Sequence, residues 1–174
     1  MKPRIPFDQF VTKLNKARQI DLARLAAYID GEGCISISVS KPRGTAITKG
    51  FSLNLTVTNT DIRLLNWVTS VFGGTHCQAN NNHQKPGTKK CWRWCICELQ
   101  AEEILRRCLP YFIIKAEQAQ IALDFRNLMI ESRGKRGTPV TSEALAKRED
   151  FQRRIIALNS AKGFGLVKSA AKAS

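Results

Sequence analysis

Two acidic residues alternate with two glycines in the segment Asp30-Gly31-Glu32-Gly33, directly after an apolar, alanine-rich stretch. An acid held there could serve chemistry, because carboxylate oxygens are ligands that hard divalent cations such as Mg²⁺ prefer. The simpler interpretation is a helix stop, since glycines end helices by adopting positive φ. An acid at a helix C-terminus also opposes the helix dipole, at a cost of about 0.3–1 kcal/mol. The four residues alone leave both interpretations open.

The residues before this segment predict the helix that would carry it, from Asp21 to about Asp30. One face of this helix is apolar and suits the core: Leu22, Leu25, Ala26 and Ile29. The second face contains Ala23, Ala27 and Asp30. Its small residues would let another helix approach closely.

Alternating apolar and polar residues predict four strands in two hairpins. Residues 34–40 (CISISVS) and 51–59 (FSLNLTVTN) form the first pair, and residues 75–80 and 90–99 form the second. Further helices are expected at 61–72, 101–108, 113–130 and 142–161, the first capped by Thr60 or Asn59 and closed by Gly73-Gly74. The order α-ββ-α-ββ-α-α-α predicts an α+β fold, with a four-stranded antiparallel sheet and its helices on one face.

The other face of this sheet would carry hydrogen-bonding side chains. A β-ribbon with such groups can enter the DNA major groove and read base edges, although any antiparallel sheet can also present a polar face to solvent. The residues expected on this face are Ser36, Ser38, Ser40, Asn54, Thr56, His76, Gln78, Asn80 and Arg93, whereas Trp92, Trp94 and Ile96 are expected in the core.

The charge balance favours a polyanionic partner. The chain has 28 Lys+Arg against 14 Asp+Glu, a formal net charge of +14, and a pI near 9.9. Between Gly33 and Cys97 the only acid is Asp61. The basic residues of the same stretch are Lys41, Arg43, Lys49, Arg63, Lys85, Lys89, Lys90 and Arg93.

The six cysteines do not have the spacing of a zinc site, because no C-x-x-C pair or H-x-x-x-H partner accompanies them. We expect them to be small, buried apolar side chains in a reducing compartment. The chain has no run of about 18 apolar residues and no signal peptide pattern. The expected location is intracellular, in the cytoplasm of a prokaryote or an organelle matrix.

Residues 25–33, LAAYIDGEG, resemble the motif of the LAGLIDADG homing endonucleases. Ala27 and Tyr28 replace its Gly and Leu, Gly31 its Ala, and Glu32 its second Asp. Three further segments are similar to single-motif members: LTVTNTDIR, LPYFIIKAEQAQ and ALNSAKG. The resemblance covers one domain, residues 20–165, and leaves 1–19 as an N-terminal extension and 166–174 as a basic C-terminal tail.

The resemblance implies which residues act. Glu32, Asn59, Arg63 and Lys115 take the catalytic positions, and Glu32, with the Gly31 carbonyl, would hold Mg²⁺ or Mn²⁺. Asp30 is given a structural role in capping and packing where helices cross. DNA contacts are expected from Ser36, Ser38, Ser40, Lys41, Arg43, Asn54, Thr56, His76, Gln78, Asn80, Arg93, Asn159, Ser160 and Lys162.

One motif per chain implies a homodimer, with Ala23, Ala27, Asp30 and Gly31 at an isologous interface. The implied function is a site-specific double-strand DNA endonuclease, intron-encoded and acting on a long pseudo-palindromic site. The alternative is a non-cleaving nucleic-acid-binding protein of the same fold, such as an intron RNA maturase or a transcriptional regulator. A third possibility, an RNA-associated structural protein, explains the charge but not the DGEG segment. The sequence leaves the target open.

Overall fold

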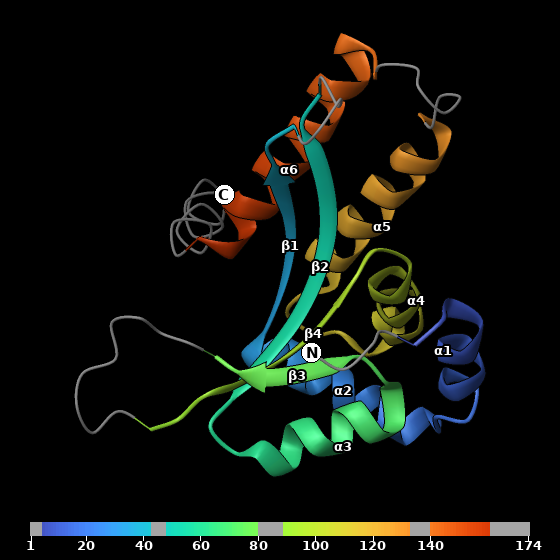
Figure 1. Cartoon of the computed structure of the whole chain (residues 1–174), viewed down its shortest axis with the longest axis vertical. Coiled ribbons are helices and arrows are strands. Elements are labelled where there is room, and N and C mark those ends of the chain that lie inside the picture. Colours follow the sequence, from blue (N-terminus) through green and yellow to red (C-terminus); the bar gives the residue numbers. More distant parts are fainter. Residues whose placement is uncertain (1–4, 43–47, 80–88, 133–139, 161–174) are drawn as a thin grey trace, which may run out of the picture.

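The computed structural model describes residues 5–42, 48–79, 89–132 and 140–160. Figure 1 shows its elements, which run along the chain as α1 (Phe7–Leu14), α2 (Gln19–Glu32), β1 (Gly33–Ser40), β2 (Gly50–Asn59), α3 (Ile62–Phe72), β3 (Thr75–Gln78), β4 (Trp92–Cys97), α4 (Glu98–Cys108), the 3-10 helix η1 (Leu109–Tyr111), α5 (Ala116–Glu131) and α6 (Ser142–Asn159). From α2 onward this is the predicted α-ββ-α-ββ-α-α-α order, and the α+β fold is confirmed.

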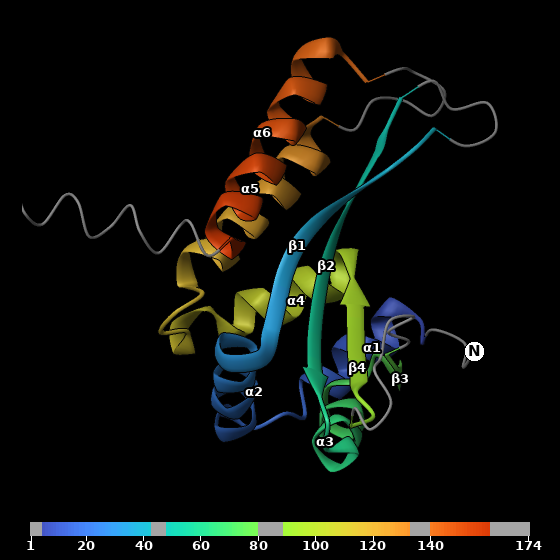
Figure 2. The same cartoon turned by 90° about the vertical axis from the view of Figure 1, so that its left-hand side faces the viewer.

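The four strands form one antiparallel sheet in the order β1-β2-β4-β3. β1 and β2 pair from Gly33–Val57 to Ser40–Gly50, whereas β4 pairs with β2 only from Asn54 onward. The first hairpin therefore extends beyond the second as a long, curved arm, visible in Figure 2.

The core lies between one face of the sheet and the helices. Ile35, Leu53, Leu55, Val57 and Trp94 are fully buried, and each alternates along its strand with less buried residues. α4 contacts β2 and β4, α3 contacts β4, and α5 and α6 lie side by side and contact β1 (Figures 1 and 2). No described helix is both long and apolar enough to cross a membrane.

The N-terminal segment contributes to this core through α1. Phe10 and Leu14 are fully buried, and α1 packs on α3 and α4. The Lys13 Nζ donates a hydrogen bond to the Thr69 carbonyl oxygen of α3, at 3.1 Å. The described part of the predicted extension, residues 5–19 of 1–19, thus packs on two helices of the domain.

Helix α2 ends differently from the prediction. It continues through Gly31 to Glu32, and Gly33 has an extended conformation with φ −88°, so positive φ is not what ends it. Gly33 is instead required by a close approach, since a Cβ there would lie 2.6 Å from the Ile29 Cα. Positive φ occurs at Gly73 and Gly74, which end α3 as predicted. The N-cap of α3 is Asp61, not Thr60 or Asn59, because its side chain accepts the Arg63 N–H.

Candidate functional site

Glu32 and Asn59 meet where α2 and β2 end. Glu32 is the last residue of α2, and its side chain is exposed. The Asn59 Nδ2 donates a hydrogen bond to Glu32 Oε2, while the Asn59 Oδ1 accepts the backbone N–H of Asp61 at 2.7 Å. Both ends of the amide are in use, so Asn59 fixes the Glu32 carboxylate relative to the start of α3.

Arg63 is held by Asp61, a residue that the sequence reasoning did not select. The Arg63 Nη2 lies 2.6 Å from Asp61 Oδ2, and its Nε donates to the same carboxylate at 3.0 Å. The side-chain hydrogen bond from Arg63, followed by that of the Arg63 backbone N–H, lowers the pKa of Asp61 to about 2 and the same pair raises the pKa of Arg63. The available sequence signal was the preference for Asp at a helix N-cap.

Lys115 and Asp30 connect α2 to the beginning of α5. The Asp30 carboxylate accepts the backbone N–H groups of Ile113 and Lys115 at 2.8 and 2.9 Å, and the Lys115 Nζ donates to the Asp30 carbonyl oxygen. Lys115 is therefore fixed to Asp30, which lies two residues before Glu32 in the chain. The Asp30 carboxylate thus joins α2 to the segment that leads into α5.

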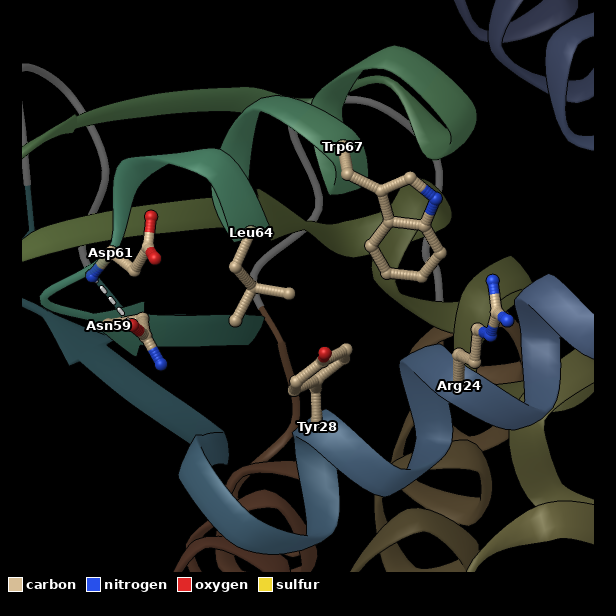
Figure 3. A pocket seen from close by; sticks show the side chains of 6 residues that line it. All are labelled: Arg24, Tyr28, Asn59, Asp61, Leu64 and Trp67. Carbon is tan, nitrogen blue, oxygen red and sulfur yellow. Dashed lines mark hydrogen bonds between the residues drawn. The ribbon is translucent and has the colours of Figure 1, made fainter.

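A cavity of about 440 Å³ lies between α2 and α3, next to Asn59. Figure 3 shows Tyr28 and Arg24 of α2 on one side and Leu64 and Trp67 of α3 on the other. The Tyr28 and Trp67 rings are 6.0 Å apart between centroids. The cavity is thus an aromatic groove beside the exposed face of α2.

The exposed face of α2 is small and apolar. Ala27 and Gly31 are exposed, Ala23 is half-buried, and Ile20, outside the predicted interface, is 52% exposed. A Cβ at Gly31 would meet no atom within 4 Å. The prediction that Asp30 shares this face is wrong, because Asp30 is buried against residues 113 and 115 of its own chain.

The face of the sheet opposite the core carries most of the predicted polar residues. In register, Ser36 lies opposite Asn54, and Thr56 lies opposite both Cys34 and Cys95. The Asn54 Nδ2 donates to the Ser38 Oγ at 2.8 Å. Ser40, Lys41 and Arg93 are exposed.

Two predicted residues of β3 lie on the other face. His76 and Gln78 are in register with the core-facing Trp94 and Trp92, so their placement beside Ser36 and Asn54 was wrong. His76 Nδ1 is 2.9 Å from the Thr69 Oγ1 of α3, on the helix side. Thr75 and Cys77 take their places, opposite Cys95 and Arg93.

The expectation that the cysteines are buried is wrong for five of the six. Only Cys108 is buried, and burial raises the pKa of its thiol to about 12. The other five are exposed or half-buried: Cys34, Cys77, Cys91, Cys95 and Cys97. Four of these belong to the sheet and lie on its helix-free face, because they alternate with core-facing residues or pair with residues of that face: Cys34, Cys77, Cys95 and Cys97.

The C-terminal prediction is only partly within the described residues. The Asn159 Nδ2 donates to the Ile35 carbonyl oxygen of β1 at 2.8 Å, and the Ser160 Oγ donates to the Ala157 carbonyl oxygen at 2.9 Å. The end of α6 is therefore tied to the edge strand β1. Arg43, Asn80 and Lys162 lie outside the described residues.

The chain has the LAGLIDADG homing endonuclease fold. It is similar to I-CvuI in complex with the I-CreI target in the presence of Mg, where the DNA is not cleaved, with a TM-score of 0.62, 19% identity, and 80% of this chain and 82% of that chain covered. It is also similar to the archaeal intron-encoded homing endonuclease I-Vdi141I complexed with DNA, with a TM-score of 0.64, 13% identity, and 82% of this chain and 86% of that chain covered. The LAGLIDADG meganuclease I-AabMI bound to uncleaved DNA has a TM-score of 0.60 and 18% identity, with 80% of this chain and 47% of that chain covered. These identities show likeness of fold. No family model and no curated protein matches the sequence.

Proposed function

We propose that this protein is a divalent-metal-dependent, site-specific DNA endonuclease that acts as a homodimer and is encoded within an intron. The observation that carries the proposal is the exposed carboxylate of Glu32, which ends the motif helix and is oriented by Asn59. The fold neighbours include endonucleases in complex with DNA. The net charge of +14 supports a polyanionic substrate.

The residues at this site fit a magnesium ion better than zinc or iron. Among the described residues, no three His, Cys, Asp or Glu side chains group together as a protein cage. Mg²⁺ retains several waters and is commonly bound by one or two carboxylates together with substrate phosphates. Glu32 supplies one such carboxylate, and the Gly31 carbonyl is proposed as a second oxygen. When bound, the metal supplies stabilisation of charge on the phosphate and on an attacking water.

The other residues act by position and charge. Asn59 holds Glu32 in place, and we propose that it also orients the attacking water through its hydrogen-bond network. Arg63 and Lys115 would stabilise negative charge at the scissile phosphate. In the free chain their cationic groups are bonded to Asp61 and to the Asp30 carbonyl, so contact with DNA requires that these partners be exchanged or shared.

The dimer is proposed from the exposed face of α2. Ala27 and Gly31 are exposed without a large side chain between them, and Ile113, beside the end of α2, is 90% exposed. A second copy packed on this face by two-fold symmetry would cover these residues and bring two Glu32 carboxylates together. The match to I-AabMI, which covers 47% of that chain, is consistent with two such units making up the whole.

Cleavage is tested by selecting duplexes from a random DNA library with the full chain and Mg²⁺. We expect a discrete site, cut on both strands, and the same selection with Mn²⁺ replacing Mg²⁺ should also yield cleavage. The Glu32→Gln variant should bind the selected duplex without cutting it. Glu131→Gln, which removes an exposed acid at the far end of α5, is the matched control and should cut normally.

Three outcomes contradict parts of the proposal. Cleavage that persists in Glu32→Gln would exclude Glu32 as the metal-holding acid. Selective binding without cleavage under any divalent metal would favour the non-cleaving alternative. Tighter binding of structured RNA than of any DNA duplex would point to an intron RNA partner.

The dimer is tested by sedimentation. Ala27→Glu places a charge in the proposed seam and should give a monomer in analytical ultracentrifugation. Asn66→Glu introduces the same charge at an exposed position of α3 and should leave the dimer intact. A dimer unaffected by Ala27→Glu would place the interface elsewhere.

A further inference from the structure

The helix-free face of the sheet changes its chemistry along the strands. Close to Glu32, one continuous row crosses all four strands: Cys34, Thr56, Cys95 and Thr75. Each of these side chains presents a thiol or a methyl group, and the Thr75 Oγ1 lies 3.7 Å from the Cys95 Sγ. We call these four residues the thiol row; Cys97 lies on the next register line, opposite Asn54.

The distal end of the same face is built for hydrogen bonding. Ser38 and Ser52 lie opposite each other, Asn54 donates to both the Ser38 Oγ and the Ser52 carbonyl oxygen, and Lys41 follows β1. Ser38 is four residues from Cys34, about 13 Å along an extended strand. That distance corresponds to roughly four base pairs of DNA.

Thiols and methyl groups recognise a different feature of DNA from hydroxyls and amides. A free cysteine behaves as a small apolar side chain with a weak donor. In the major groove, the apolar feature of a base pair is the C5-methyl group of thymine, which threonine methyls and other small apolar groups contact. Hydroxyl, amide and ammonium groups instead pair with the donors and acceptors of the base edges.

We propose that the thiol row reads thymine methyl groups in the part of each half-site nearest the cleaved phosphates, whereas the distal end of β1 and β2 reads hydrogen-bonding base edges. This inference rests on the proposed function, and it adds a chemical specificity to it. Cys34 and Cys95 are the residues that determine the preference. Cys34 lies two residues after Glu32, and Cys95 shares its register line through Thr56. The apolar contacts are therefore closer to the candidate catalytic site than Ser38 and Ser52 are.

The preference is tested on the duplex selected from the random library. Each thymine of a half-site is replaced, one position at a time, by deoxyuridine, which removes only the methyl group, and the dissociation constant is measured by fluorescence anisotropy with Ca²⁺ in place of Mg²⁺. Loss of one buried methyl group should weaken binding about fourfold at inner positions. Replacements at outer positions should change binding less than about 1.5-fold.

Serine variants connect the effect to the thiols. Cys95→Ser should bind the thymine duplex more weakly and should no longer distinguish thymine from deoxyuridine at the inner position that it contacts. Cys34→Ser, on a different strand, should remove discrimination at another inner position. Cys77→Ser is the matched control: Cys77 is exposed on the same face but opposite Arg93, outside the thiol row, so discrimination at the two positions assigned to Cys34 and Cys95 should be unchanged.

Alkylation supplies an independent measurement on the unmodified chain. With N-ethylmaleimide followed by mass spectrometry, Cys34 and Cys95 should react in the free protein and be protected by the selected duplex. Cys108 is buried with a raised pKa, so its modification reports unfolding and serves as an internal control.

Specific results would overturn the inference. A selected site without thymine at its inner positions, inner deoxyuridine replacements without effect, or unchanged discrimination in both Cys95→Ser and Cys34→Ser would each contradict it. Failure to select any duplex is a separate result, because it would refute the proposed endonuclease function itself.

Discussion

Asp30 should be essential to the fold and to the site for the same structural reason. Its buried carboxylate accepts two backbone hydrogen bonds, from Ile113 at 2.8 Å and from Lys115 at 2.9 Å. In Asp30→Asn one acceptor oxygen becomes an NH₂ group, so one bond is lost and two donors face each other. A hydrogen bond to a charged group contributes about 1.5–3 kcal/mol, and we expect the free energy of unfolding to fall by about 2–3 kcal/mol.

Urea denaturation followed by tryptophan fluorescence measures this loss. With a slope of about 2 kcal/mol/M, the unfolding midpoint should fall by about 1–1.5 M urea. Because the same bonds fix Lys115 near Glu32, cleavage of the selected duplex should also be impaired at temperatures where the variant is fully folded.

A second carboxylate in the same helix provides the control. Asp21 is buried at the other end of α2, where it accepts hydrogen bonds from the Arg18 side chain and backbone. Asp21→Asn should lower the unfolding midpoint but leave cleavage per folded molecule unchanged. An Asp30→Asn midpoint within about 0.2 M of the native value, or equal loss of cleavage in both variants, would refute the reasoning.

Three other predictions concern charge, backbone and substrate. Arg63 lowers the pKa of Asp61 to about 2, so the stabilisation from this pair is fully present above the ordinary value of 3.8 and is lost as the pH falls through about 2. NMR titration of the Asp61 carboxyl carbon should show this midpoint, and Arg63→Gln should return it toward 3.8. Gly74→Ala should lower the free energy of unfolding by about 2–4 kcal/mol, because φ is +77° and a Cβ would lie 2.6 Å from both Trp94 Nε1 and Ile96 Cγ2. Gly31→Ala, in open space on a helix, should leave the free energy of unfolding unchanged or raise it by up to about 1 kcal/mol, and equal unfolding midpoints in urea would contradict both expectations. The logarithm of DNA affinity should fall with the logarithm of salt concentration by about 0.9 per phosphate neutralised, and a shallow slope in anisotropy titrations would argue against a phosphate-dominated interface.

The strands and the motif helix could be predicted from the sequence because their signals are local. The alternation in residues 34–40 and 51–59 marks one face as apolar in each strand, so the facing of Ser36 and Asn54 followed directly. β3 is different, because its four residues, Thr75–Gln78, include no large apolar side chain to indicate the core. Only the register with β4 shows that His76 faces the helices and Cys77 does not.

Other differences arise from contacts between distant segments. Cysteine is a commonly buried residue, and the expectation of burial came from that preference alone. The alternation in CWRWCIC, with Trp92, Trp94 and Ile96 as the predicted core face, already indicates that Cys95 and Cys97 point to the helix-free face. The role of Asp61 depends on Asn59 and Arg63 together, and that of Asp30 on residues 83 and 85 positions away. Phe10 and Leu14 form an amphipathic pattern, but only the fold shows that α3 and α4 bury them.

The bonded amide of Asn59 has an electrostatic consequence for Glu32. As the last residue of α2, this acid faces the negative end of its own helix dipole. Through Asn59, whose oxygen accepts the Asp61 N–H and whose nitrogen donates to Glu32, it is also connected to the first free N–H groups of α3, the positive end of a second helix. The two bonds are oriented head to tail, so each polarises the other. The negative end of α2 and the positive end of α3 thus meet near one carboxylate, and Asn59 connects that carboxylate to the positive end.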